Sequence, residues 1–150
     1  DEDNNRTLLQ RKLKEGISYR GKKVTFNKQF IATGKEAIDY LKANQVDLFI
    51  TDRRMPGMDG WELLSEICNV VGEKYVPKQE YGVKKGRIVM FTGQTAPQDI
   101  ERIETGGLGF LPKPLSSYLN ATERYLCSMI EKSPNWFPQD FYTISDMFIY

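Results

Sequence analysis

Apolar and polar positions along the chain follow two alternating patterns. Short, mainly apolar runs have the length of buried β-strands and lie at Val46–Thr51, Arg87–Thr92 and Leu108–Leu111, with a weaker candidate at Val24–Phe26. Around them, apolar residues recur every three or four positions, which is typical of helices that bury one face. The helices predicted in this way span Arg6–Lys14, Lys35–Ala43, Trp61–Val71, residues 95–105 and Leu115–Lys132.

Strands that alternate with helices predict an α/β fold: a doubly wound parallel sheet with helices on both faces. Turn residues separate the elements, with Gly16 ending the first helix and a proline- and glycine-containing loop at Arg53–Gly60. There is no internal repeat, and a chain of 150 residues fits a single core.

Two segments do not fit this pattern of strand and helix units. Residues 72–87 carry five basic and two acidic residues, and they are either a solvated loop or a partner-binding insertion opposite the active edge of the sheet. The tail, residues 133–150, is rich in aromatic residues, which favours packing over disorder. We therefore expect a domain over residues 1–132 and a C-terminal extension over 133–150 that packs on it.

Composition excludes several classes of function. The net charge of +1 gives no case for nucleic acid, and no apolar run reaches the roughly 18 residues of a membrane span. Cys68 and Cys127 lie in apolar helical patterns, so we expect buried free thiols and a cytoplasmic protein. The chain has no histidine, which excludes Ser-His-Asp and Cys-His catalysis and histidine zinc sites.

Residues suited to phosphoryl transfer follow the predicted strands. Asp52 comes after the strand at Val46–Thr51, Thr92 closes the next strand, and Lys113 follows the third. Ligands of open α/β sheets bind beyond the carboxyl ends of the strands, so we expect these side chains to converge there with the acidic residues at the N-terminus. A carboxylate can form an acyl phosphate, while a divalent cation and a lysine neutralise the phosphoryl oxygens.

The stretch Asp52–Gly60 (DRRMPGMDG) resembles the loop that follows the phosphoacceptor in response-regulator receiver domains of two-component signalling, the CheY-like family. Residues 32–37, Met90–Gly93 and Phe110–Pro114 resemble that family's second turn, fourth strand and fifth strand. The resemblance covers about residues 1–132 and implies a flavodoxin-like fold. It also admits the receiver of a hybrid histidine kinase, because the sequence does not separate this from a stand-alone regulator.

The resemblance implies a role for each matching position. Asp52 would take the phosphoryl group, Thr92 and Lys113 would each bind one of its oxygens, and Phe110 would be the aromatic switch residue that follows Thr92. Arg54 and Gln94 would set the lifetime of the phosphate by controlling the access of water.

The metal site implied by the resemblance would hold Mg²⁺. Its ligands would be the Asp52 carboxylate, the backbone carbonyl of Arg54 and the Asp1 carboxylate, with Glu2 as a fallback if the alignment is shifted by one residue. A haloacid-dehalogenase-type phosphatase would need a second aspartate at position 54, where arginine stands instead.

The family's first strand and first acidic residue are absent before Asp1. That strand is normally interior, so its absence would expose the edges of both neighbours. Three explanations are open. The chain could be truncated, another chain could supply the strand, or the tail could fill the gap by inserting Met147–Tyr150 in parallel. If the tail fills it, deletion of residues 146–150 should cause gross unfolding.

The reaction implied is phosphoryl transfer to Asp52 from a phosphohistidine on a histidine kinase or histidine phosphotransfer protein. Such a domain would catalyse its own phosphorylation and dephosphorylation, with no turnover of a separate substrate. Its switched output would be the surface formed by residues 96–132, which could also support a dimer. The alternative is a non-catalytic, receiver-like interaction module that has lost its metal site.

Overall fold

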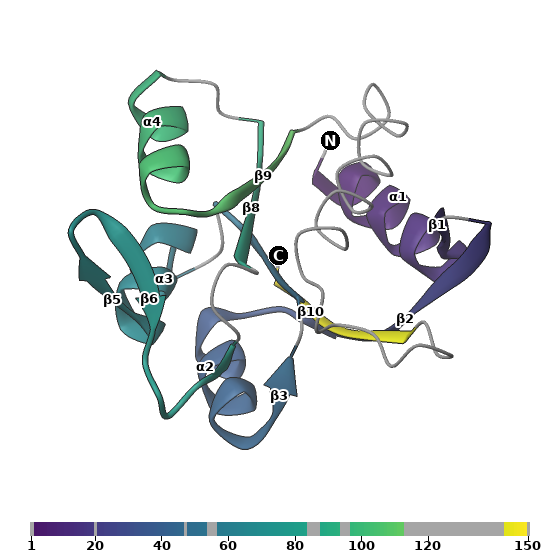
Figure 1. Cartoon of the computed structure of the whole chain (residues 1–150), viewed down its shortest axis with the longest axis horizontal. Helices are drawn as coiled ribbons and strands as arrows, with labels where there is room; N and C mark the ends of the chain where they lie inside the picture. Colours follow the sequence, from purple (N-terminus) through teal and green to yellow (C-terminus); the bar gives the residue numbers. More distant parts are fainter. Residues whose placement is uncertain are drawn as a thin grey trace.

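The structure is a computed structural model that describes residues 2–19, 21–46, 48–53, 57–83, 88–93, 97–112 and 143–149. Its main sheet has six strands in the order β1-β2-β10-β4-β8-β9 (Figure 1). The strands span Ile17–Tyr19 (β1), Lys22–Ile31 (β2), Leu48–Asp52 (β4), Ile88–Thr92 (β8), Gly109–Pro112 (β9) and Thr143–Ile149 (β10). Strands β2, β10, β4, β8 and β9 are parallel, whereas β1 is an antiparallel edge strand next to β2.

The C-terminal strand β10 lies inside the sheet, between β2 and β4. Its partners run from Thr143 opposite Thr25 to Ile149 opposite Ile31 on one side, and Ile149 lies opposite Thr51 on the other. The predicted filling of the gap by the tail is confirmed for Met147–Ile149, and the inserted strand begins earlier than predicted, at Thr143. With β10 in the first-strand position, the order of the parallel strands is that of flavodoxin-like folds.

The helices span Glu2–Glu15 (α1), Gly34–Ala43 (α2), Gly60–Ile67 (α3) and Pro97–Thr105 (α4). Figure 1 shows α1 on one side of the strands and α2 and α3 on the other, as expected for a doubly wound sheet. Local signals set their ends: α1 stops at Gly16, which has a φ of 80°, and Thr33 caps α2 by accepting the Glu36 N–H. The predicted helix at Leu115–Lys132 lies outside the described residues.

The prediction of one helix over Trp61–Val71 is wrong in its last four residues. Helix α3 ends at Ile67, and Cys68–Val71 (β5) forms an antiparallel hairpin with Lys74–Pro77 (β6). The two turn residues Gly72 and Glu73 both have positive φ, the geometry of a tight type I′ hairpin turn. The β-branched pair before Gly72 favours a strand, and this local preference overrides the helical spacing of the apolar residues.

Residues 72–83 are therefore not a plain solvated loop. Besides β6, they contain β7 (Gly82–Val83), which pairs in parallel with β3 (Gln45–Val46) in a separate small sheet. The hairpin lies at the amino end of β9, as expected for a segment opposite the active edge, because Tyr75 N–H donates to the Gly106 carbonyl just before that strand.

The core lies between the sheet and α2, α3 and α4. Strands β4 and β8 are buried along their whole length, which matches their nearly continuous apolar sequences. The cluster they form includes Phe49, Leu64 and Ile103. In the part of the chain that the structure describes, no helix is long and apolar enough to cross a membrane.

Candidate functional site

Asp52 and Thr92 lie side by side at one edge of the main sheet. Asp52 is the last residue of β4 and Thr92 the last residue of β8, and these strands pair in parallel. Asp52 lies opposite Phe91, so Thr92 stands one residue further toward the carboxyl edge. Each residue is 3% exposed, so a polar group and an ionisable group are buried where such sheets bind ligands.

Backbone contacts fix the position of Asp52. The Arg53 N–H donates to the Phe91 carbonyl at 3.4 Å, and the Gly60 N–H donates to the Arg53 carbonyl at 2.8 Å. A Cβ at Gly60 would lie 2.6 Å from the Asp52 carbonyl oxygen, so only glycine allows α3 to start this close to β4. The end of β4 is thereby held against the first turn of α3.

Asp59, the second aspartate of the motif, has a structural contact. Its carboxylate accepts the Glu62 N–H at 2.8 Å and caps α3. This is a common use of aspartate at a helix start and accounts for its place before Gly60.

Strand β9 brings the switch candidate to the same region. Phe110 lies opposite Met90 and Pro112 opposite Thr92, and Lys113 follows Pro112 in the chain. Phe110 is half-buried and packs against the core cluster. A repacking of this ring would therefore change the contacts of residues in that core cluster.

The other site candidates are near the N-terminus and just after β4, β8 and β9 in the sequence. Asp1, Arg54, Gln94 and Lys113 lie outside the described residues, and of Glu2 the structure describes only that it begins α1. Within the described ranges, no group of three or more Asp, Glu, Cys or His residues could hold a metal ion. The Asp52 carboxylate has the oxygen chemistry that Mg²⁺ prefers, so one of the expected ligands fits this edge.

Sequence reasoning missed the contact that joins this edge to α4. Arg53 Nε lies 3.7 Å from Asp99 Oδ2, and the two side chains are 23% and 15% exposed. This ion pair depends on how α4 packs beside the end of β4, and no local pattern in the sequence predicts that packing.

Comparisons with known proteins identify relatives of this chain. Residues 1–119 match the model of the family described as response regulator receiver domain. The heme response regulator HssR of Staphylococcus haemolyticus (strain JCSC1435) is 34% identical over 84 residues, which are 55% of this chain and 32% of that protein. The two-component response regulator ORR11 of Oryza sativa subsp. indica is 32% identical over 87 residues, 57% of this chain and 52% of that protein.

The alignments thus span about half or less of the length of these curated relatives. A solved signal receiver domain of a signal transduction histidine kinase from Syntrophus aciditrophicus is also similar, with a TM-score of 0.46 and 24% identity over 75% of this chain and 79% of that chain. The family match covers well over half of the chain, and the order of the parallel strands agrees with it. The chain therefore belongs to the response regulator receiver domain family of two-component signalling.

Proposed function

We propose that Asp52 accepts a phosphoryl group from a phosphohistidine on a histidine kinase or a histidine phosphotransfer protein. The observation that carries this proposal is the burial of Asp52 beside Thr92 at the carboxyl ends of two neighbouring strands. An Asp52 carboxylate oxygen attacks the phosphorus, the N–P bond of the donor breaks, and the imidazole leaves with the bonding electrons. The product is an acyl phosphate at the end of β4.

We infer that the site would hold Mg²⁺, which would neutralise charge on the phosphoryl oxygens. Asp52, the Arg54 carbonyl and Asp1 would hold it, with Glu2 as the alternative acid. Thr92 would donate its hydroxyl to one phosphoryl oxygen and Lys113 would pair with another. Arg54 and Gln94 would control the access of water and so the lifetime of the acyl phosphate.

The output is a change of surface rather than turnover of a second substrate. Phosphorylation adds close to two negative charges at the end of β4. Thr92 would move toward them and Phe110 would follow into the vacated space, so the surface of residues 96–132 changes shape. That surface would bind the next component or a second copy of the chain.

The test uses acetyl phosphate or beryllofluoride with Mg²⁺ on the wild-type chain and on Asp52→Asn. With acetyl phosphate, we expect the intact mass measured in acid to rise by one phosphoryl group in the wild type alone, and hydroxylamine should remove the added group. Backbone NMR signals of Thr92 and Phe110 should shift in the wild type and stay in place in Asp52→Asn. Asp39→Asn, an exposed aspartate of α2, is the matched control and should behave as wild type.

If the wild type neither takes up phosphate nor shifts with beryllofluoride, the phosphoacceptor function is excluded and a non-catalytic, receiver-like interaction module takes its place. Phosphate uptake that persists in Asp52→Asn would instead place the acceptor elsewhere.

A further inference from the structure

Helix α4 is held by different contacts at its two ends. At its C-terminal end, Tyr75 of β6 donates its backbone N–H to the Gly106 carbonyl at 3.0 Å. The Arg102 Nε–H donates to the Tyr75 hydroxyl at 2.8 Å, a hydrogen bond strengthened by the charge of the guanidinium. The β5–β6 hairpin is thereby attached to the end of α4 by one backbone bond and one side-chain bond.

Trp61 of α3 extends this attachment into the core. The Arg102 guanidinium carbon lies 3.9 Å from the centroid of the Trp61 ring, and the Trp61 and Tyr75 rings are 5.9 Å apart. Both rings are buried while Arg102 is exposed, so water screens part of the attraction between cation and ring. Together, Trp61, Tyr75, Arg102 and Gly106 form what we call the hairpin clamp.

Gly106 allows the clamp to close. A Cβ at this position would lie 2.7 Å from a Tyr75 ring carbon and 2.7 Å from the Arg102 carbonyl oxygen. The ring of Tyr75 therefore lies directly against the backbone at the end of α4. Several contacts of different kinds would have to break before this end of the helix could move.

Near the N-terminal end of α4, the described side chains make a weaker contact. In the described part of the chain, its ion pair is the one between Asp99 and Arg53, at 3.7 Å and partly open to solvent. Such pairs contribute little, because water screens them and ordering two long side chains costs entropy. Arg53 directly follows Asp52, so this ion pair joins the end of β4 to the first turn of α4.

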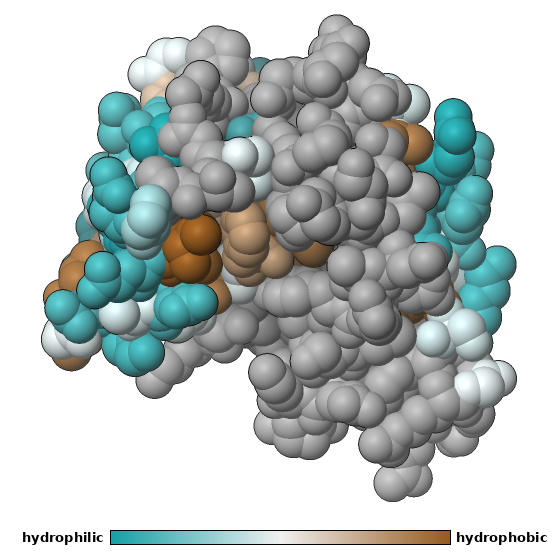
Figure 2. All heavy atoms as spheres, turned by 90° about the horizontal axis from the view of Figure 1, so that it is seen from above, coloured by the Kyte–Doolittle hydropathy of each residue, from teal (hydrophilic) through white to brown (hydrophobic). Residues whose placement is uncertain are grey.

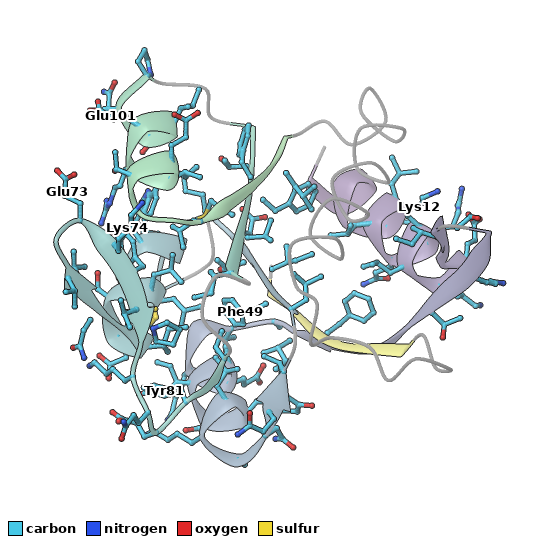
Figure 3. The ribbon with its side chains drawn as sticks, viewed as in Figure 1. Lys12, Phe49, Glu73, Lys74, Tyr81 and Glu101 are labelled. Carbon is cyan, nitrogen blue, oxygen red and sulfur yellow. The ribbon has the colours of Figure 1, made fainter. Side chains whose placement is uncertain are left out.

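A hollow separates much of α4 from the hairpin. Its volume is about 290 Å³, and its lining includes Gln98, Glu101 and Thr105 of α4 and Val70 and Glu73 of the hairpin. Figure 3 shows Glu101 on α4 and Glu73 and Lys74 on the hairpin at the same side of the molecule. The clamp residues Tyr75 and Arg102 also line the hollow, which follows α4 from Gln98 to Thr105.

We propose that α4 pivots about the hairpin clamp when Asp52 is phosphorylated, an inference that rests on the proposed function. The new charge on Asp52 competes with Asp99 for the Arg53 guanidinium, because two negative charges attract it more strongly than one. The first turn of α4 is then released and moves, while the clamp keeps the last turn in place. The hairpin is the fixed point of the switch.

Amide hydrogen exchange on the full chain tests the pivot, with beryllofluoride and Mg²⁺ as the probe. The Tyr75 amide reports the clamp directly, because it donates to Gly106, and the Glu101 amide reports the first half of α4. We expect the probe to change Glu101 exchange about tenfold and Tyr75 exchange less than about twofold, as separate opening units would. Equal changes at both amides would overturn the pivot.

Three variants separate the two ends. Arg102→Met should speed Tyr75 exchange about tenfold without the probe, as expected for loss of a charge-assisted hydrogen bond. Tyr75→Phe, which removes only the hydroxyl and preserves packing, should do so to a smaller extent. Asp99→Asn should leave the Tyr75 amide unchanged and should bring Glu101 exchange close to its probe-bound rate.

The result distinguishes this inference from the proposed function. If Thr92 and Phe110 do not respond to the probe, the proposed function fails whatever α4 does. If they respond while Arg102→Met leaves the Tyr75 amide protected, the clamp does not hold the helix and the pivot alone is refuted.

Discussion

Strand β10 and the β5–β6 hairpin both depart from the repeated strand–helix pattern, yet the chain uses them in opposite ways. Strand β10 lies between β2 and β4 and has partners along both edges. The hairpin forms its own two-stranded sheet and leaves Val70 and Val71 58% and 62% exposed. In Figure 2, apolar atoms interrupt the hydrophilic surface at the side of the molecule where the hairpin lies.

The difference shows that position in the sheet, rather than position in the sequence, decides how much a segment contributes to the stability of the fold. Removing an interior strand uncovers the hydrogen-bonding edges of two neighbours and opens the core between them. Removing a peripheral hairpin contact affects one helix end. We therefore expect perturbations of β10 to be global and perturbations of the hairpin to be local.

The largest effect should follow deletion of residues 146–150, which removes most of β10. We expect loss of cooperative unfolding, because β2 and β4 lose the strand that joins them. Circular dichroism melting and the dispersion of amide NMR signals would measure it, and a synthetic peptide of residues 143–150 added in trans should restore part of both. A deletion variant that melts at the wild-type temperature would show that β10 is not needed in the sheet.

Much of the fold could be predicted because its signals are local. The apolar runs of β4, β8 and β9 and the capped helix α2 were found within a few residues of their observed ends. The hairpin was missed because its apolar residues also fit a helical spacing, and only the turn at Gly72 and Glu73 separates the two. Strand β1 was missed because its three residues are too few for a pattern to appear.

The site could be predicted only as far as strand ends define it. Asp52 and Thr92 follow from the rule that chemistry lies at the carboxyl ends of parallel strands, and the structure places both there. The Arg53–Asp99 pair and the Arg102–Trp61 stack join residues that are distant in the sequence. Such contacts depend on how helices pack on the sheet, which no window of sequence contains.

The alkylation rate of Cys68, the first residue of β5, tests whether the start of the hairpin is shielded from solvent. Burial raises the pKa of its thiol to about 12, although the Lys78 ammonium nearby lowers it in part. At pH 8 we expect Cys68 to react with iodoacetamide about a thousandfold more slowly than an ordinary cysteine, since only the thiolate reacts. Mass spectrometry of the digested protein separates Cys68 from Cys127, and the reaction in urea is the control.

The same shift predicts how stability depends on pH. The pKa of Cys68 in the folded chain lies above its ordinary value of 9.0, so folding favours the protonated thiol. This contribution is complete below pH 9 and is lost as the pH rises toward 12. A Cys68→Ala variant should lose that part of the alkaline destabilisation, which urea denaturation at several pH values would measure. In the alkylation experiment, fast reaction of native Cys68 would show instead that solvent reaches the start of the hairpin.

A smaller effect should follow Gly106→Ala, which forces the hairpin clamp apart. The added methyl group would meet the Tyr75 ring and the Arg102 carbonyl, and we expect a loss of about 1–3 kcal/mol in the free energy of unfolding. Urea denaturation measures it. Gly72→Ala is the matched control in the hairpin turn: its Cβ meets nothing within 4 Å, so its cost should come from the positive φ alone.

Helix α4 should separate from the hairpin in Gly106→Ala while the main sheet stays intact. A Gly106→Ala variant as stable as the wild type would mean that the close approach at Gly106 contributes nothing, and the clamp would then lack its tightest contact.

The smallest effect should come from Val71→Thr, which places a hydroxyl of similar size at an exposed position of β5. Water satisfies that hydroxyl, so the free energy of unfolding should stay within about 0.5 kcal/mol of wild type. The same change at Val89, in the interior strand β8 and fully buried, should cost about 1–3 kcal/mol because its hydroxyl enters an apolar core. Chemical denaturation of the two variants measures the contrast between periphery and interior with one substitution. A cost at Val71 that equals the cost at Val89 would mean that the hairpin is covered in solution, and it would then have to be counted with β10 as part of the core.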